Sequence, residues 1–126
     1  MAEEMVAGER EIDHSGPIDL FARYAARVPY EMLLGPSEYH APDAFSDEEL
    51  GRAFALVAKG LRRLHAVEGP TPVNVWLHTA PFGEEGHWRF EIVPRLTVLA
   101  GLELGAGIFV NWLPPEQAAA TLREAL

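Results

Sequence analysis

Apolar and polar side chains alternate most regularly over residues 87–93, where the chain reads HWRFEIV. One side of the predicted strand carries Trp88, Phe90 and Ile92, and the other carries His87, Arg89 and Glu91. Because a strand rises about 3.3 Å per residue, a base, a cation and a carboxylate would line one sheet face at intervals of roughly 6 to 7 Å. We therefore take this face as the first candidate for a functional site.

The N-terminal third predicts two strands joined by a short connection. Residues 18–24 and 30–34 carry this strand pattern, and their close spacing predicts an antiparallel hairpin. Residues 1–15 are mostly polar and acidic and show no consistent period, which predicts a loose leader, with an unpaired first strand as the alternative.

A long helix is predicted from Ser46, because this serine precedes Glu49 by three residues in the pattern of a capping box. Its apolar stripe repeats at steps of three and four residues and consists of Leu50, Phe54, Val57, Leu61 and Leu64. Arg62, Arg63 and His65 fall in the predicted last turn, where positive charge is favoured. Gly69 and Pro70 end the segment.

Another strand is predicted over 73–78, and its polar-bearing face ends on His78. If it pairs antiparallel with the strand after His87, His78 approaches Arg89 and Glu91. A second helix is expected to open at Pro114 and Pro115 and to bury Ala118, Leu122 and Ala125. The order of elements predicts an α+β domain over 1–126, with an antiparallel sheet, one long central helix and a C-terminal helix.

Composition narrows the classes of function. The chain has 126 residues, a net charge of -9 and no cysteine, so disulfides, thiolate nucleophiles and cysteine zinc sites are excluded. The net negative charge makes nucleic acid an unfavourable partner. No apolar run is long enough to cross a membrane, and the acidic N-terminus is unlike a signal peptide, so we expect a cytoplasmic location.

Catalytic patterns such as GxSxG, HExxH, Walker and GxGxxG are absent from the sequence. Of the five histidines, His78 and His87 are the better candidates, because each lies where a strand meets the same loop. Glu103 stands among apolar neighbours, so its carboxylate needs a partner or access to water.

Several segments, in order, resemble the C-terminal half of galactose-1-phosphate uridylyltransferases, a group that includes ADP-glucose phosphorylase. They are ARVPYE at 26–31, SDEEL at 46–50, LHTAP at 77–81, HW at 87–88, EIVPRL at 91–96, AGLELGAGIFVN at 100–111 and PPEQAA at 114–119. The resemblance implies a histidine-triad (HIT-like) fold. It also implies that Glu103 hydrogen-bonds a hexose and that His78, His87, Arg89 and Glu91 lie in the substrate-binding half.

The resemblance departs from the family at two points. A histidine of an HPH motif in the family's other half takes the nucleotidyl group covalently, and no HPH occurs in these residues. His78 matches a zinc or iron ligand, whereas Arg89 replaces a nearby ligand histidine and cannot coordinate a metal. We therefore predict no metal or other cofactor and no catalytic residue on this chain.

Three interpretations remain open. The chain can be a substrate-binding half that works with an HPH-bearing partner half, a non-catalytic module for a nucleotide sugar or sugar phosphate, or a structural dimerisation domain. A homodimer is expected in the absence of a partner half, because half of a two-lobed fold would leave an apolar surface exposed.

Overall fold

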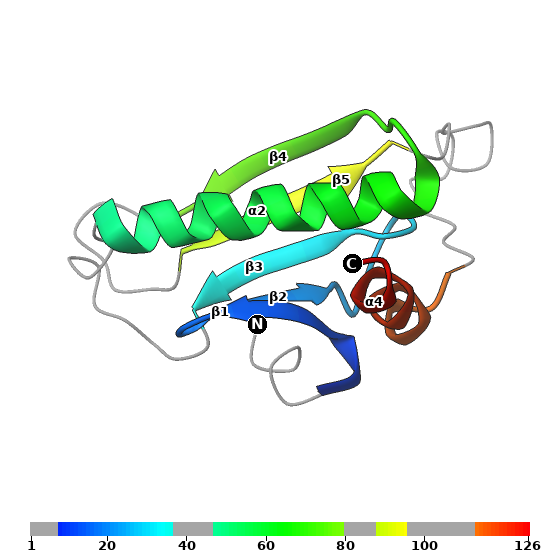
Figure 1. Cartoon of the computed structure of the whole chain (residues 1–126), viewed down its shortest axis with the longest axis horizontal. Helices are drawn as coiled ribbons and strands as arrows, with labels where there is room; N and C mark the ends of the chain where they lie inside the picture. The colour runs from blue at the N-terminus through cyan, green and yellow to red at the C-terminus, as the bar shows by residue number, and fades with distance from the viewer. Residues whose placement is uncertain (1–7, 37–46, 80–87, 96–112) are drawn as a thin grey trace.

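The computed structural model describes residues 8–36, 47–79, 88–95 and 113–126, and its strands form one antiparallel sheet (Figure 1). The elements in chain order are η1 (Gly8–Arg10), β1 (Glu11–Ser15), β2 (Ile18–Ala22), β3 (Met32–Pro36), α2 (Asp47–Glu68), β4 (Val73–His78), β5 (Arg89–Pro94) and α4 (Pro115–Glu124). The sheet order is β1-β2-β3-β5-β4, so β5 lies between β3 and β4. The predicted hairpin and the predicted β4–β5 pairing are both confirmed.

Both helices pack on the same face of the sheet, where the hydrophobic core lies (Figure 1). From the strands the core takes Ile12, Ile18, Leu20, Ala22, Met32, Leu34, Phe90 and Ile92. Ala118 and Leu122 of α4 are buried against it, as predicted, and so is Ala119, which the predicted stripe did not include. Ala125 is only half-buried. The predicted α+β architecture is confirmed, and one face of the sheet is left without a covering helix among the described elements.

The buried stripe of α2 differs from the predicted one. Phe54 was expected to face the sheet, but it is 56% exposed, and its ring lies tilted against that of Phe90 with the centroids 5.6 Å apart. Small residues lie beneath the helix instead, since Ala53 is fully buried and a Cβ on Gly60 would lie 3.1 Å from Leu20. Because α2 approaches the sheet closely at these small residues, the bulky Phe54 lies at the side of the helix and not beneath it. Ser46, the predicted cap, lies outside the described residues, and Gly69 ends the helix with a φ of +74°.

The prediction of a loose leader is wrong for residues 8–15. After the 3-10 turn η1, β1 pairs antiparallel with β2, and Ile12 is buried in the core. The register shifts by one residue between Glu11 and Asp13, a β-bulge that interrupts the alternation. A five-residue strand with a bulge and one core side chain has no visible period, which explains the error. Residues 1–7 lie outside the described part.

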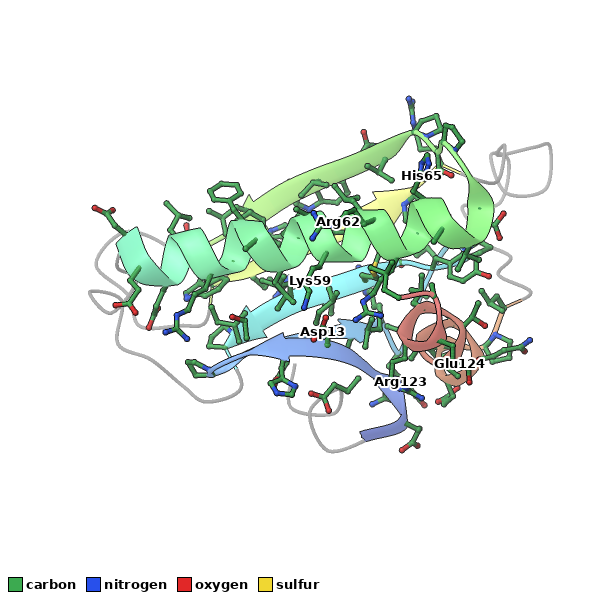
Figure 2. The ribbon with its side chains drawn as sticks, viewed as in Figure 1. Asp13, Lys59, Arg62, His65, Arg123 and Glu124 are labelled. Atoms are coloured by element: carbon green, nitrogen blue, oxygen red, sulfur yellow. The ribbon has the colours of Figure 1, made fainter. Side chains whose placement is uncertain are left out.

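Arg63 is buried rather than placed at an exposed helix end. Its guanidinium donates hydrogen bonds of 3.0 Å to the carbonyls of Leu122 and Arg123 and one of 2.9 Å to the Asp13 carboxylate. Asp13 also lies 3.3 Å from Lys59 (Figure 2). Arg63 therefore ties α2 to the last turn of α4 and to β1, whereas Arg62 and His65 are exposed as expected.

In the described ranges, no helix combines the length and apolar character that a membrane span requires.

Candidate functional site

The sheet face turned away from α2 carries a cluster of charged side chains. The register sets Glu91 of β5 between Leu33 of β3 and Trp76 of β4, and it sets His78 opposite Arg89. Because alternate residues of a strand share a face, Arg89 and Glu91 project on the side opposite the buried Phe90 and Ile92. The strand pattern therefore places His78, Arg89 and Glu91 together, as predicted.

Glu91 is the centre of this cluster, and its carboxylate is only 6% exposed. Its Oε1 lies 3.5 Å from Arg89 Nε and 3.6 Å from Arg23 Nη1. Its Oε2 lies 3.5 Å from His78 Nε2 and 4.0 Å from Arg27 Nη2. The three guanidinium groups are the partners that this buried carboxylate needs, because burial of an unpaired charge is costly.

A second carboxylate, Glu31, completes the cluster from the residue before β3, and its side chain is fully buried. Arg27 donates to it from Nη2 at 2.7 Å, from Nε at 3.2 Å and from its backbone N–H at 2.8 Å. Arg23 Nη1 adds a hydrogen bond of 3.2 Å. The hydrogen bond with Glu31 is the main reason why the pKa of the Arg27 guanidinium lies above its usual value.

His78 is oriented by its neighbour on β4. Trp76 Nε1 donates a hydrogen bond of 2.5 Å to His78 Nε2, and the two rings meet edge to face. The imidazole is thereby held beside Glu91 while its side chain stays 43% exposed. Arg27 and Arg89 are exposed to a similar degree, at 38% and 40%.

The cluster is cationic although the chain is acidic. It contains Arg23, Arg27 and Arg89 against two glutamates, which gives a local charge of +1 with histidine counted as neutral, in a chain of net charge -9. The carboxylates are buried and the cationic ends reach solvent, so an approaching ligand meets the positive groups. Guanidinium groups bind phosphate oxygens with paired donors, which makes this face suited to a phosphate-bearing ligand.

Sequence reasoning found part of this cluster. His87 and Glu103, the other two predicted site residues, lie outside the described residues. Glu31, Arg23 and Arg27 were missed as site residues, although the sequence contained a signal for Arg23 and for Glu31. Arg23 falls on the polar side of the strand predicted over 18–24, and Glu31 is a lone carboxylate directly before the apolar run MLL.

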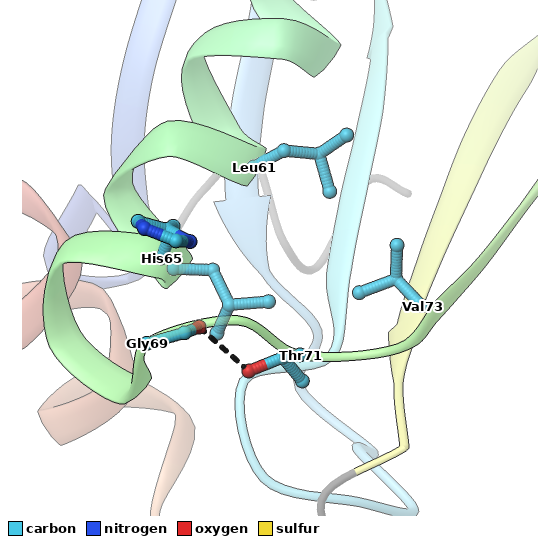
Figure 3. Close-up of a pocket in the computed structure, with 6 residues that line it drawn as sticks. Leu61, His65, Gly69, Thr71 and Val73 are labelled. Atoms are coloured by element: carbon cyan, nitrogen blue, oxygen red, sulfur yellow. Dashed lines mark hydrogen bonds between the residues drawn. The ribbon is translucent and has the colours of Figure 1, made fainter.

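A cavity elsewhere lacks the chemistry of this cluster. It has a volume of about 200 Å³ and lies where α2 ends and β4 begins (Figure 3). Its walls are Leu61, Leu64, His65, Gly69, Thr71 and Val73. Thr71 Oγ1 donates to the Gly69 carbonyl at 3.0 Å, so its hydroxyl serves the turn. With one exposed imidazole and no arginine in its lining, this cavity offers little to a phosphate.

Comparison with known proteins identifies the fold class first. A HIT-like protein from Bartonella henselae matches with a TM-score of 0.65 over 92% of this chain and 85% of its own, at 18% identity. At that identity the likeness concerns the fold alone, and it agrees with the antiparallel sheet and long helix described above. The chain has a HIT-like fold. No protein-family model matches it.

Two curated relatives match most of this chain at 30% identity or more. ADP-glucose phosphorylase from Arabidopsis thaliana is 30% identical over 90% of this chain and 34% of its own length. A crystal structure of such an enzyme from that plant, with bound ADP-glucose, matches with a TM-score of 0.80 at 27% identity, over 91% of this chain and 40% of its own. Galactose-1-phosphate uridylyltransferase from Streptomyces lividans is 34% identical over 97% of this chain and 40% of its own length. The predicted resemblance is confirmed, and the chain spans between a third and two fifths of these curated relatives.

The resemblance implies a metal at His78, and the described residues do not fit one. Glu91, the carboxylate next to His78, is contacted by three guanidinium groups that occupy the space beside both of its oxygens. Among the residues placed by the structure, no group of three histidine, cysteine, aspartate or glutamate side chains is arranged to hold an ion.

We therefore expect purified protein to contain no stoichiometric zinc or iron, because the guanidinium groups already supply the positive charge that an ion would bring. Elemental analysis by plasma mass spectrometry checks this. One tightly held metal ion per chain, released only by a strong chelator, would contradict it.

Proposed function

We propose that this chain is the ligand-binding part of a hexose-1-phosphate uridylyltransferase-type system in cytoplasmic galactose metabolism, and that it performs no nucleotidyl transfer alone. The observation that carries the proposal is the set of solvent-reaching cations around Glu91, presented by a fold whose relatives act on nucleotide sugars. The ligand class is a nucleotide sugar or a sugar phosphate.

We infer that the chain performs no nucleotidyl transfer alone, because the described residues include no positioned nucleophile. Covalent catalysis needs a nucleophile set beside a general base or otherwise activated. Within the described ranges the histidines are His14, His65 and His78; the first two are exposed, and the Nε2 of His78 accepts the indole N–H of Trp76. The sequence contains no HPH motif. Transfer would therefore need an HPH-bearing half from another chain.

The binding proposal is tested by calorimetric titration with UDP-glucose, ADP-glucose and galactose 1-phosphate. Arg89→Ala is expected to weaken binding of the preferred ligand by about tenfold or more, since a hydrogen bond to a charged group contributes about 1.5–3 kcal/mol. Arg52→Ala is the matched control, because it removes an arginine of similar exposure that pairs with Glu48 at 3.2 Å on the helix surface.

Binding by the wild-type chain that Arg89→Ala leaves unchanged would show that Arg89 forms only a surface ion pair. The same incubated samples should show no nucleotidyl adduct in the intact mass. A uridylylated or adenylylated histidine would overturn the proposal that the chain performs no nucleotidyl transfer alone.

The sheet edge formed by β4 supports association with a second HIT-like half. β4 is the last strand in the sheet order, and its central side chains are unusually open: Val75 is 38%, Trp76 36% and Leu77 39% exposed. Phe54 of α2, on the sheet face of Val75 and Leu77, is also exposed. An edge strand flanked by apolar side chains is a ready surface for another strand. The same surface favours the alternative function, a structural dimerisation domain.

Without an HPH-bearing half, we expect the chain to form a homodimer at tens of micromolar. Leu77→Glu should shift it to the monomer, because a charge would be buried at the contact. Leu126→Glu, at an exposed C-terminal leucine, is the control. Light scattering coupled to size exclusion measures the mass, and a wild-type monomer at this concentration would contradict the expectation.

A further inference from the structure

The segment between β2 and β3 is shaped around Glu31. Its ends are joined by a hydrogen bond of 2.9 Å from the Arg23 N–H to the Glu31 carbonyl, and the Glu31 N–H donates to Val28 at 3.4 Å. Tyr30 has a φ of +61°, a left-handed conformation that a bulky non-glycine residue rarely adopts. Such a conformation persists only where the surrounding contacts hold it.

The contacts of Glu31 fix one side chain above all, that of Arg27. The buried carboxylate accepts two hydrogen bonds from the guanidinium and a third from the backbone of the same arginine. The planar guanidinium is held in one orientation by this paired contact, whereas a lone ammonium would not be. Glu31 itself is screened from solvent, so it can act on a ligand only through the arginines that it holds. Arg27 is the main one, because it makes three hydrogen bonds to the carboxylate and Arg23 makes one.

Arg27 and Arg89 lie at different oxygens of Glu91. Arg27 Nη2 is 4.0 Å from Oε2, and Arg89 Nε is 3.5 Å from Oε1. Both side chains remain more than a third exposed. Arg23 also contacts Glu91, at 3.6 Å, but its side chain is less exposed, at 27%. Arg27 and Arg89 are therefore the two guanidinium groups of the cluster that present the most surface to a ligand.

We propose that Glu31 is a positioning residue that presents Arg27 to the ligand as a cationic contact of the phosphate site, beside Arg89. This inference rests on the proposed function, because it assumes that the Arg89 face binds a phosphate ligand. It adds a site element that lies far in sequence from Arg89.

A double-mutant cycle tests the positioning role. The dissociation constant is measured calorimetrically for wild type, Glu31→Gln, Arg27→Ala and the double variant, with UDP-glucose or ADP-glucose, whichever the wild type binds more tightly. Each single substitution should weaken binding by about tenfold, and the double variant should bind no more weakly than Arg27→Ala alone, because Glu31 acts through Arg27.

Glu31→Gln retains the shape of the side chain, and circular dichroism shows whether it folds. Should it fail to fold, Arg27→Lys replaces it, since lysine keeps the charge but loses the paired contact with Glu31, and the same loss of affinity is expected. Glu48→Gln, at the exposed helix pair, is the control and should bind as wild type does.

Three results would overturn the inference. Multiplicative losses in the double variant would show that Glu31 affects binding independently of Arg27, which overturns the positioning role. Tight wild-type binding unaffected by Arg27→Ala would overturn the same inference and leave the proposed function standing. Failure of the wild-type chain to bind any of the three ligands would overturn both.

Discussion

Glu31→Ala is expected to lower the free energy of unfolding by about 3 kcal/mol, a large share of the roughly 5–15 kcal/mol that stabilises a domain. The substitution removes a fully buried carboxylate that accepts hydrogen bonds from Arg23 and from three groups of Arg27. Breaking a buried ion pair costs about 3–5 kcal/mol, and we expect the lower end because both arginines left behind reach solvent.

Urea denaturation measures this effect. Glu48→Ala is the matched control, since Glu48 also pairs with an arginine, but its side chain is 78% exposed. Such exposed helix pairs contribute about 0.3–0.5 kcal/mol. Equal losses for the two variants would show that the buried cluster contributes no more than a surface pair.

Arg63→Ala is expected to cost a comparable amount, about 3 kcal/mol, because it leaves two carbonyls at the end of α4 and the Asp13 carboxylate without their donor. Arg62→Ala is the control, since it removes the neighbouring arginine from the exposed side of the same helix. Urea denaturation at pH 7 should separate the two variants clearly.

The cost of Arg63→Ala should also depend on pH. Burial raises the pKa of Asp13, but hydrogen bonds from Arg63, the His14 N–H and Lys59 outweigh it, so the pKa lies below its usual 3.8. A carboxyl with a lowered folded-state pKa adds stability above about pH 4, and this stability is lost as the pH falls through the folded pKa. The difference between wild type and Arg63→Ala should therefore shrink at pH 3. A difference that stays constant or grows would contradict the role of the Asp13–Arg63 pair.

The sequence predicted the elements with strong periods and missed those held by tertiary contacts. Strand alternation placed Arg89 and Glu91 on one face and brought His78 to them, because a strand of period two leaves no freedom once its apolar side is buried. A turn between β2 and β3 brings Glu31 and Arg27 to the site. Tyr30 in this turn has a left-handed backbone conformation, which no local sequence pattern predicts.

The errors in the helical layer have a similar cause. Phe54 fitted the apolar period, but the close contact at Ala53 and Gly60 decided which side of α2 meets the sheet. Arg63 looked like one of several cations at a helix end, and only the position of α4 and β1 makes it a buried donor. Helix propensity and apolar period are properties of a single element. Which face of α2 is buried, and whether Arg63 is buried, depends on the elements packed against it.

The most direct measurement of the central claim is an NMR titration of the arginine side chains with UDP-glucose. If the sheet face around Glu91 binds a phosphate ligand, the Nε–H signals of Arg89 and Arg27 will shift together and saturate, while those of Arg52 and Arg62 will stay in place. Saturating binding that leaves the Arg89 and Arg27 signals unmoved, or no change in any arginine signal, would contradict it.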